Sequence, residues 1–319
     1  MTNRMGDKTA IAREAYRSSH ATGAVYEHDL LGDVRRWEKR SECGNPACTR
    51  SWLKILKDWR RPVFEGQWGC STECMKAIVQ TALRRELAED QNEHGELKHQ
   101  HRVPLGLVLL AQGLITQSQL QHALDMQRIA GRGRIGSWLV SEYGLKEERV
   151  TRALGLQWNC PVLPIEGFDA QAMALLAPRE LVKRVGMLPL RIAAGRILYL
   201  AFEDRLDASA AFAMQRMSGL KVESGLVDGA QLKVAWHLLR DCDFVDAAFE
   251  QVDDIESMSS EITFTLGKIQ PRASRLVHVH QYFWLRMWLE SGAMSTREGG
   301  IPATKEDVVD RLYTIGFVQ

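Results

Sequence analysis

The chain has 319 residues, of which 45% are hydrophobic and 25% charged, and its formal net charge at pH 7 is +1. This length accommodates two or three small domains of ordinary globular composition. The near-neutral charge excludes a strong overall attraction to nucleic acid or to an anionic membrane, so an electrostatic partner must contact a local patch. No apolar run approaches the ~18 residues that span a bilayer, and the polar N-terminus lacks the apolar core of a signal peptide. We therefore expect a cytoplasmic protein without a membrane span.

The N-terminal part contains two cysteine pairs. Residues 1–30 are polar and weakly patterned and are predicted to form a flexible arm. Residues 31–95 contain Cys43 with Cys48, and then Cys70 with Cys74 at the start of a helical pattern. Disulfides are rare in the cytoplasm, and four thiolates from two short turns suit tetrahedral Zn²⁺. We predict a structural zinc module, because four cysteines fill the coordination sphere. The alternative is four reduced cysteines without a metal.

The two cysteine pairs resemble those of a treble-clef zinc finger, in which the second pair also lies at a helix start. The first pair departs from that pattern, because four residues separate its cysteines instead of two. Nine Lys or Arg residues and three Trp lie between residues 35 and 61. This pattern is compatible with nucleic acid, with an acidic protein partner or with a solvated face, and we rank nucleic acid below a protein partner.

Two 24-residue segments, 104–127 and 134–157, repeat one pattern. Each has an apolar residue and a Gly at its second and third positions, an apolar pair at its sixth and seventh, and Leu-x-x-Gln at its end. Internal repetition predicts two copies of one helical unit packed about a pseudo-twofold axis. Thr116 with Gln119 forms a capping-box signature that begins a helix, and Gly113 is suited to end the helix before it.

After the repeats, the spacing of apolar residues changes from a helical pattern to one that includes strands. Residues 187–202 predict a β-hairpin, Asp207 begins a helix that Gly219 ends, residues 220–227 predict a strand, and Asp228 caps a further helix. This order predicts a small α/β lobe over residues 161–240. Residues 241–319 are predicted to form a C-terminal helical extension, with the aromatic stretch 275–290 as a buried helix or an interaction surface. Thr304 with Asp307 is expected to begin the last helix.

The tandem repeat resembles the tandem motif of the MshE-type N-terminal domain of GspE/PilB-type ATPases, which serve type II secretion and type IV pili. The segments CPVLPI, MLPLRIAAGRILYLAFEDRLD and MSGLKVESGLV resemble the α/β part of that domain. The resemblance covers roughly residues 102–240. It implies a helical tandem-motif lobe at 102–160, an α/β lobe at 161–240 and, as in some members, binding of cyclic di-GMP, with one half of the dinucleotide on each motif.

The resemblance also implies the contacts of that ligand. The glycines would let the backbone approach the nucleotide, the arginine would stack on a guanine, and the aliphatic residues would form apolar walls. Two positions depart from the family, because Pro104 stands where the family has Arg, and Tyr143 with Gly144 replaces Gly and an aliphatic residue, which shifts the turn. The implied contact residues are Leu105, Gly106, Leu109, Leu110, Arg134, Ile135, Gly136, Leu139 and Val140.

The ATPase domain of these proteins is not expected in this chain. Gly267 and Lys268 are the nearest candidate for a phosphate-binding loop, but Ile269 follows and no Gly lies five residues earlier, so no Walker motif forms. We expect an α+β protein that acts as a non-catalytic sensor or adaptor, linked to a protein of secretion, pilus or signalling machinery. The alternatives are a ligand-free protein-interaction module and a nucleic-acid-binding regulator that uses the basic zinc region. The sequence leaves open the partner, the oligomeric state, and whether the motif with Pro104 and Tyr143 still binds nucleotide.

Overall fold

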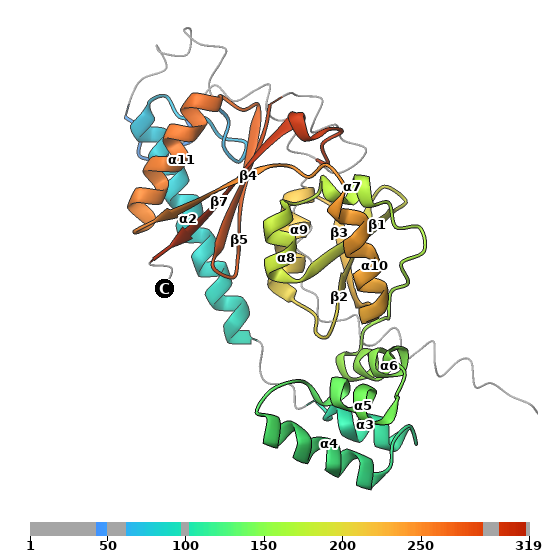
Figure 1. Cartoon of the computed structure of the whole chain (residues 1–319). Coiled ribbons are helices and arrows are strands. Elements are labelled where there is room, and N and C mark those ends of the chain that lie inside the picture. Colours follow the sequence, from blue (N-terminus) through green and yellow to red (C-terminus); the bar gives the residue numbers. More distant parts are fainter. Residues whose placement is uncertain (1–42, 50–61, 97–101, 290–299, 317–319) are drawn as a thin grey trace, which may run out of the picture.

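The computed structural model describes residues 43–49, 62–96, 102–289 and 300–316, and these form three neighbouring parts (Figure 1). A four-stranded sheet carries two long helices, an α/β lobe adjoins it, and a lobe of four helices follows at the far end of the α/β lobe. The arm predicted at residues 1–30 and the cations and tryptophans between 35 and 61 lie outside the described residues.

Helix α2 (Thr72–Glu96) begins at the second cysteine pair. It continues the helical pattern predicted after Cys74 and extends into the polar stretch that follows. Its apolar residues Met75, Ile78, Val79 and Leu83 are buried, because they face the sheet and helix α11 rather than solvent. Burial of this stripe fixes α2 along the sheet.

The helical lobe consists of α3 (Leu105–Ala111), α4 (Gln117–Ala130), α5 (Ile135–Tyr143) and α6 (Glu147–Trp158). The capping box of Thr116 and Gln119 is confirmed, since each residue bonds the backbone N–H of the other. Gly113 follows α3 in the left-handed region (φ +65°), where glycine carries no Cβ penalty. The lobe has its own small core, which contains Leu109, Ile115, Leu120, Ala123, Leu139 and Ala153.

The α/β lobe has the predicted order of hairpin, helix, strand and helix, but two short helices that the sequence did not predict precede the hairpin. It contains α7 (Ala170–Ala174), α8 (Arg179–Val185), β1 (Met187–Ala193), β2 (Ile197–Phe202), α9 (Ala208–Ser218), β3 (Lys221–Leu226) and α10 (Gly229–Arg240). Strand β1 pairs antiparallel with β2, and β2 pairs parallel with β3. Asp207 caps α9 and Asp228 caps α10, each by accepting backbone N–H groups of the first turn. Gly219 ends α9 in the left-handed region, as predicted.

The prediction of a C-terminal helical extension is wrong. Residues beyond 241 form β4 (Ala247–Val252), α11 (Ile255–Ile269), β5 (Ala273–Val279), β6 (Tyr282–Trp288), a 3₁₀ turn η4 (Lys305–Asp307) and β7 (Val308–Ile315). The strands lie in the order β4-β7-β6-β5. Every residue of β6 is buried, so the strand lacks the alternation of polar and apolar residues that would have identified it. The capping box at Thr304 begins one 3₁₀ turn, which leads into β7 instead of a helix.

This sheet is covered on both faces, which explains its apolar sequence. On one face, α2 and α11 pack over Leu276, Phe283, Leu285 and Tyr313. On the other, Val277, Trp284 and Leu312 join the core of the α/β lobe. The zinc module expected at 31–95 and the extension expected at 241–319 therefore share one core, although they are far apart in sequence.

Ion pairs reinforce the contact between the sheet and the α/β lobe. Arg216 of α9 contacts the carboxylates of Glu86 at 2.8 Å and Glu89 at 2.6 Å on α2. Arg286 of β6 binds Asp310 through two hydrogen bonds of 2.9 and 2.7 Å, and it also donates to the carbonyl of Leu176 at 2.9 Å. Glu89 is 40% exposed, whereas Arg286 and Asp310 are buried within the sheet. The Arg216 pairs thus link α9 to α2, and the bond from Arg286 to Leu176 links the sheet to the α/β lobe. Within the described residues, no helix has both the length and the apolar character needed to cross a membrane.

Candidate metal centre and tandem-motif site

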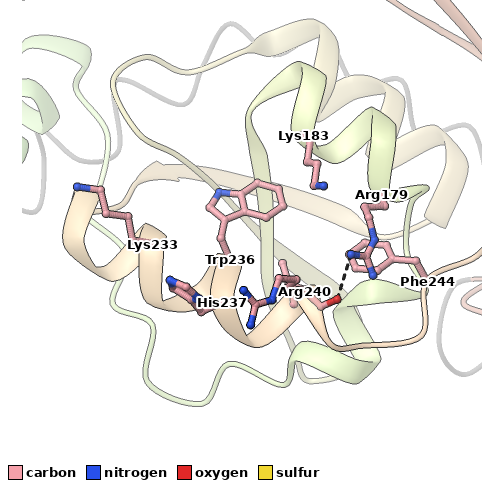
Figure 2. Close-up of a pocket in the computed structure, with 8 residues that line it drawn as sticks. Arg179, Lys183, Lys233, Trp236, His237, Arg240 and Phe244 are labelled. Atoms are coloured by element: carbon pink, nitrogen blue, oxygen red, sulfur yellow. Dashed lines mark hydrogen bonds between the residues drawn. The ribbon is translucent and has the colours of Figure 1, made fainter.

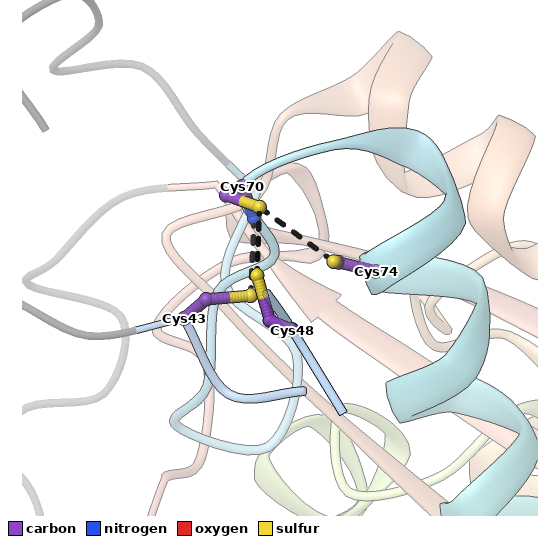
Figure 3. Close-up of side chains that lie close together, drawn as sticks. All are labelled: Cys43, Cys48, Cys70 and Cys74. Carbon is purple, nitrogen blue, oxygen red and sulfur yellow. Dashed lines mark hydrogen bonds between the residues drawn. The ribbon is translucent and has the colours of Figure 1, made fainter. Parts of the chain in front are cut away.

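The four cysteines converge at the start of α2 (Figure 3). The sulfur atoms of Cys43, Cys48, Cys70 and Cys74 all lie within 4.8 Å of one another. The Cys48 and Cys70 sulfurs are 3.4 Å apart, and those of Cys70 and Cys74 are 3.6 Å apart. Four ligands at a Zn–S distance of about 2.3 Å would be about 3.8 Å from each other in a tetrahedron. The cluster therefore has the donor set and the spacing of a four-thiolate zinc centre.

Short backbone contacts bring the two cysteine pairs together. The N–H of Gly44 donates to the carbonyl of Trp68 at 2.9 Å, which ties the first turn to the segment before α2. The Cys70 N–H donates to the Cys43 sulfur, and the side-chain amide of Asn45 donates to the Cys74 sulfur, both at 3.4 Å. N–H groups aimed at sulfur favour the thiolate form that metal binding requires.

The electrostatics of the cluster agree with this geometry. Burial raises the pKa of the Cys74 thiol, but hydrogen bonds from Asn45, Cys70 and Ser71 outweigh it and lower that pKa to about 7. Burial, assisted by hydrogen bonds with the other sulfurs, raises the pKa of the Cys70 thiol to about 12. Without a cation, four adjacent thiolates repel one another, so the cluster retains protons that a dication would displace.

The tandem motif folds as two equivalent helix pairs. Helix α5 begins 30 residues after α3, and α6 begins 30 residues after α4. Helix α3 packs against α6 and α4 packs against α5, so each repeat lies against the other. The last Gln of each repeat bonds the backbone just before the other repeat: Gln127 Nε2 donates to the carbonyl of Gly133, and Gln157 Nε2 donates to that of Val103, both at 2.7 Å. This reciprocity indicates a pseudo-twofold arrangement.

The structure divides the predicted contact residues into buried and accessible groups. Leu109 and Leu139 have no exposed surface, because they form the core of the helical lobe. Arg134 has a side chain that is 67% exposed. The half-buried positions, which reach the lobe surface, are Leu105, Leu110, Ile135 and Val140.

Gly106 and Gly136 have a packing role that the sequence did not reveal. Both are buried, and a Cβ at Gly106 would lie 2.5 Å from a methyl carbon of Leu120. A Cβ at Gly136 would lie 2.8 Å from a methyl carbon of Val150. Both glycines therefore allow helices within each repeat to approach closely, and their predicted contact with a ligand stays a prediction.

The two repeats differ at their first residue. Arg134 immediately precedes α5, and its guanidinium forms an ion pair with Asp204, which follows β2. Pro104 occupies the same place before α3 and has no such group. Arg102 lies two residues upstream, and its guanidinium stacks on the ring of Trp158 at 3.5 Å. One motif therefore presents an arginine at its first position and the other does not.

The second departure from the family, Tyr143 with Gly144, shifts a turn, as predicted. In the first repeat the left-handed residue is Gly113, whereas in the second it is Gly144 (φ +62°), one position later in the repeat. Tyr143 consequently extends α5, and its hydroxyl lies 2.7 Å from His122 Nδ1 on α4. This contact adds a bond between α4 and α5.

Sequence reasoning missed two features near these sites. Asp204 was not identified as a partner of Arg134, because they lie 70 residues apart and no local pattern connects them. A cationic groove between α8 and α10 was also missed. Its signal was present on α10, where Lys233, His237 and Arg240 follow each other at helical spacing.

Comparisons with known proteins relate about half of the chain to secretion and pilus ATPases. No family model matches the chain. The type IV pilus assembly ATPase PilB of Myxococcus xanthus is 26% identical over 161 residues, which is 49% of this chain and 28% of that protein, so the chain spans under a third of it. A solved structure of MshE with cdg (cyclic di-GMP) is 28% identical to this chain. The match covers 43% of this chain and 98% of the MshE chain, with a TM-score of 0.36.

A solved structure of the N-terminal domain of XpsE is 17% identical to this chain. The match covers 42% of this chain and 91% of the XpsE chain, with a TM-score of 0.26. The matches cover a share of the chain similar to that of the tandem motif and α/β lobe. About half of the chain is thus similar in sequence to a pilus assembly ATPase of the GspE/PilB/MshE type, and a four-cysteine cluster accompanies this region.

Proposed function

We propose that this chain is a cytoplasmic, non-catalytic sensor or adaptor in which the helical lobe (α3–α6) binds cyclic di-GMP. The supporting observation is the reciprocal pairing of the repeats, in which Gln127 and Gln157 each bond the backbone before the other repeat. A ligand with twofold symmetry matches a surface with pseudo-twofold symmetry, because each half of the ligand meets an equivalent set of groups. MshE is the protein solved with the nucleotide, and the proposal for this chain rests on its own repeats.

Arg134 is the residue that we assign to a guanine. Its planar guanidinium can stack on the base and donate to its acceptor edge. Its exposure leaves room for a ligand, although the ion pair with Asp204 must open or adjust when the base binds. Leu105, Leu110 and Ile135 would supply apolar contacts near it, whereas Leu109 and Leu139 would support the site from the core.

The first motif lacks this arginine, because Pro104 replaces it. Losing one charged hydrogen-bond partner costs about 1.5–3 kcal/mol, which is roughly one to two orders of magnitude in affinity. We therefore expect weaker binding than a motif with two arginines would give, with the nucleotide held mainly on the second repeat.

We assign a structural Zn²⁺ to Cys43, Cys48, Cys70 and Cys74. Four thiolates leave no open position for substrate, so the metal would fix the start of α2 rather than take part in a reaction. Because α2 packs on the four-stranded sheet, the metal would order the core that α2 shares with α11 and the sheet. The boundaries of these parts, with 102–160 and 161–240 between them, remain a prediction.

A domain of this type would pass a nucleotide signal to another protein. We propose a partner in secretion, pilus or signalling machinery, on the basis of the similarity to PilB. The second candidate is a ligand-free interaction module, which the complete burial of Leu109 and Leu139 favours.

Calorimetric titration of cyclic di-GMP into the zinc-loaded protein tests the ligand. We expect low-micromolar binding that Arg134→Ala weakens about 10- to 100-fold. Arg132→Ala is the matched control, since it removes the same charge from an exposed side chain two residues away and should leave binding unchanged. No binding to the folded protein, or equal weakening by both variants, would reject the nucleotide site and favour the interaction module.

Metal analysis tests the zinc centre separately. We expect one zinc ion per chain, lost in Cys43→Ser and retained in Cys160→Ser, because Cys160 lies outside the cluster. Zinc content that does not differ between these variants would contradict the assignment.

A further inference from the structure

A groove of about 350 Å³ lies between helices α8 and α10 of the α/β lobe (Figure 2), and none of its lining residues belongs to the two sites described above. Cationic side chains surround an apolar floor in this groove. Trp236 and Phe244 form part of the floor, and the cations around it include Arg179, Lys183, Lys233 and Arg240. None of the lining residues in the described part of the chain is acidic.

The positive charge of the groove is largely uncompensated. Within the described residues, Lys183 and Lys233 form no ion pair. Arg240 contacts Asp241 at 3.3 Å, but both side chains are strongly exposed (67% and 77%), so water screens this pair. The helix dipole favours cations in the last turns of α8 and α10, yet it does not account for Lys233 in mid-helix or Arg179 at the N-terminal end of α8.

The floor of the groove is preformed. Arg179 donates to the carbonyls of Arg240 at 3.0 Å and Cys242 at 3.2 Å, and its guanidinium lies 4.5 Å from the centre of the Phe244 ring. These bonds fix the turn after α10, which carries Phe244. Phe244 is 7% exposed, while Trp236 is half-buried and presents part of its indole to the groove. A rigid apolar pocket within a charged rim is the arrangement found at the centre of protein interfaces.

The lining favours a polypeptide over a nucleotide. No Ser, Thr, Asn or Gln is among the described lining residues, and the guanidinium of Arg179 already donates to two carbonyls, so only Arg240 and His237 are left to read the edge of a base. Lys233 and Arg240 are two turns apart on α10, or about 10 Å along its axis, which matches carboxylates about three residues apart in an extended peptide. Val234 and Leu238, exposed at 50% and 52%, extend the apolar surface of the same helix beyond the groove.

We propose that this groove docks an acidic polypeptide segment that inserts one apolar or aromatic side chain against Trp236 and Phe244. Carboxylates on either side of this anchor pair with the cations of α8 and α10. The docking site is independent of the nucleotide proposal, because none of its residues belongs to the helical lobe.

The test measures fluorescence anisotropy of a labelled acidic peptide, EDELFEDEE, with the full, zinc-loaded chain. A second peptide with Ser in place of Leu and Phe reports on the anchor, and pyrophosphate and ATP serve as competitors. The groove variant is Lys183→Glu with Lys233→Glu, both exposed, and Trp236→Ala probes the floor. The matched control is Lys268→Glu with Arg272→Glu, which makes the same charge change at exposed positions near the end of α11.

We expect the groove variant to weaken binding of the acidic peptide by about tenfold or more, and Trp236→Ala to weaken it severalfold. The control should stay within about twofold of the wild type, since only long-range electrostatics change there. Equal binding by wild type and groove variant would overturn the proposal, as would equal binding of the Ser-substituted peptide. Displacement of the peptide by ATP at lower concentration than unlabelled peptide would also overturn it and assign the groove to a nucleotide.

Discussion

The buried ion pair between Arg286 and Asp310 supports the sharpest stability prediction. Their side chains are 2% and 0% exposed, and two hydrogen bonds of 2.9 and 2.7 Å join them across β6 and β7. Asp310→Ala would leave a buried guanidinium that keeps one hydrogen bond, to the carbonyl of Leu176, and no counter-charge among its partners in the described residues. Breaking a buried pair in this way costs about 3–5 kcal/mol. With a urea m-value of about 2 kcal/mol/M, the unfolding midpoint should fall by about 2 M.

Urea unfolding followed by tryptophan fluorescence measures this effect, because Arg286 lies 4.9 Å from the centre of the buried Trp284 ring. The control is Arg286→Met combined with Asp310→Leu, which removes both charges and retains apolar volume. This pair of substitutions should cost much less than Asp310→Ala, since no buried charge is left alone. A loss below about 1 kcal/mol for Asp310→Ala, or a larger loss for the double variant, would refute the reasoning.

Three further predictions concern the other sites. Cys74→Ser should abolish zinc binding and speed amide hydrogen exchange in α2 and α11, which share a core, while exchange in α3–α6 stays unchanged; uniform exchange changes would contradict this coupling. Asp204→Asn should tighten cyclic di-GMP binding by up to about fivefold in calorimetry, because it releases the exposed Arg134 from a pair worth about 0–1 kcal/mol, and weaker binding would count against the assigned site. Burial raises the pKa of Asp207, but hydrogen bonds from His280 and the Ala210 N–H outweigh it and leave the pKa below its usual range. The ionised Asp207 carboxylate therefore stabilises the fold above about pH 4, and this stabilisation is lost as the pH falls through the folded-state pKa. Asp207→Asn, which keeps a capping oxygen, should therefore lose stability less steeply in acid-unfolding curves.

Local signals in the sequence were sufficient wherever neighbouring residues decide the structure. The capping box of Thr116 and the end of α9 at Gly219 follow from side-chain and backbone preferences within one helical turn. The hairpin of β1 and β2 likewise depends on residues close in sequence. The tandem repeat was readable because both copies retain Gly, the apolar pair and the final Gln at the same spacing.

The C-terminal strands could not be identified in this way. Strand β6 is covered by α2 and α11 on one face and by the α/β lobe on the other, so its sequence has no polar face. An apolar run of this length is equally compatible with a buried helix when the packing partners are unknown. The partners lie far from β6 in sequence, which is why the prediction of a helical extension failed.

The sequence by itself determined the metal ligand candidates, the two helical repeats and the order of elements from β1 to α10, because these depend on residue type and short spacing. Only the tertiary structure decided that α2 and the C-terminal strands share one core and that Arg134 pairs with Asp204. It also decided that Gly106 and Gly136 serve helix packing and that cations of α8 and α10 surround one groove. These relations arise from contacts between segments distant in the chain, where the free energy of packing, rather than local preference, selects the neighbours.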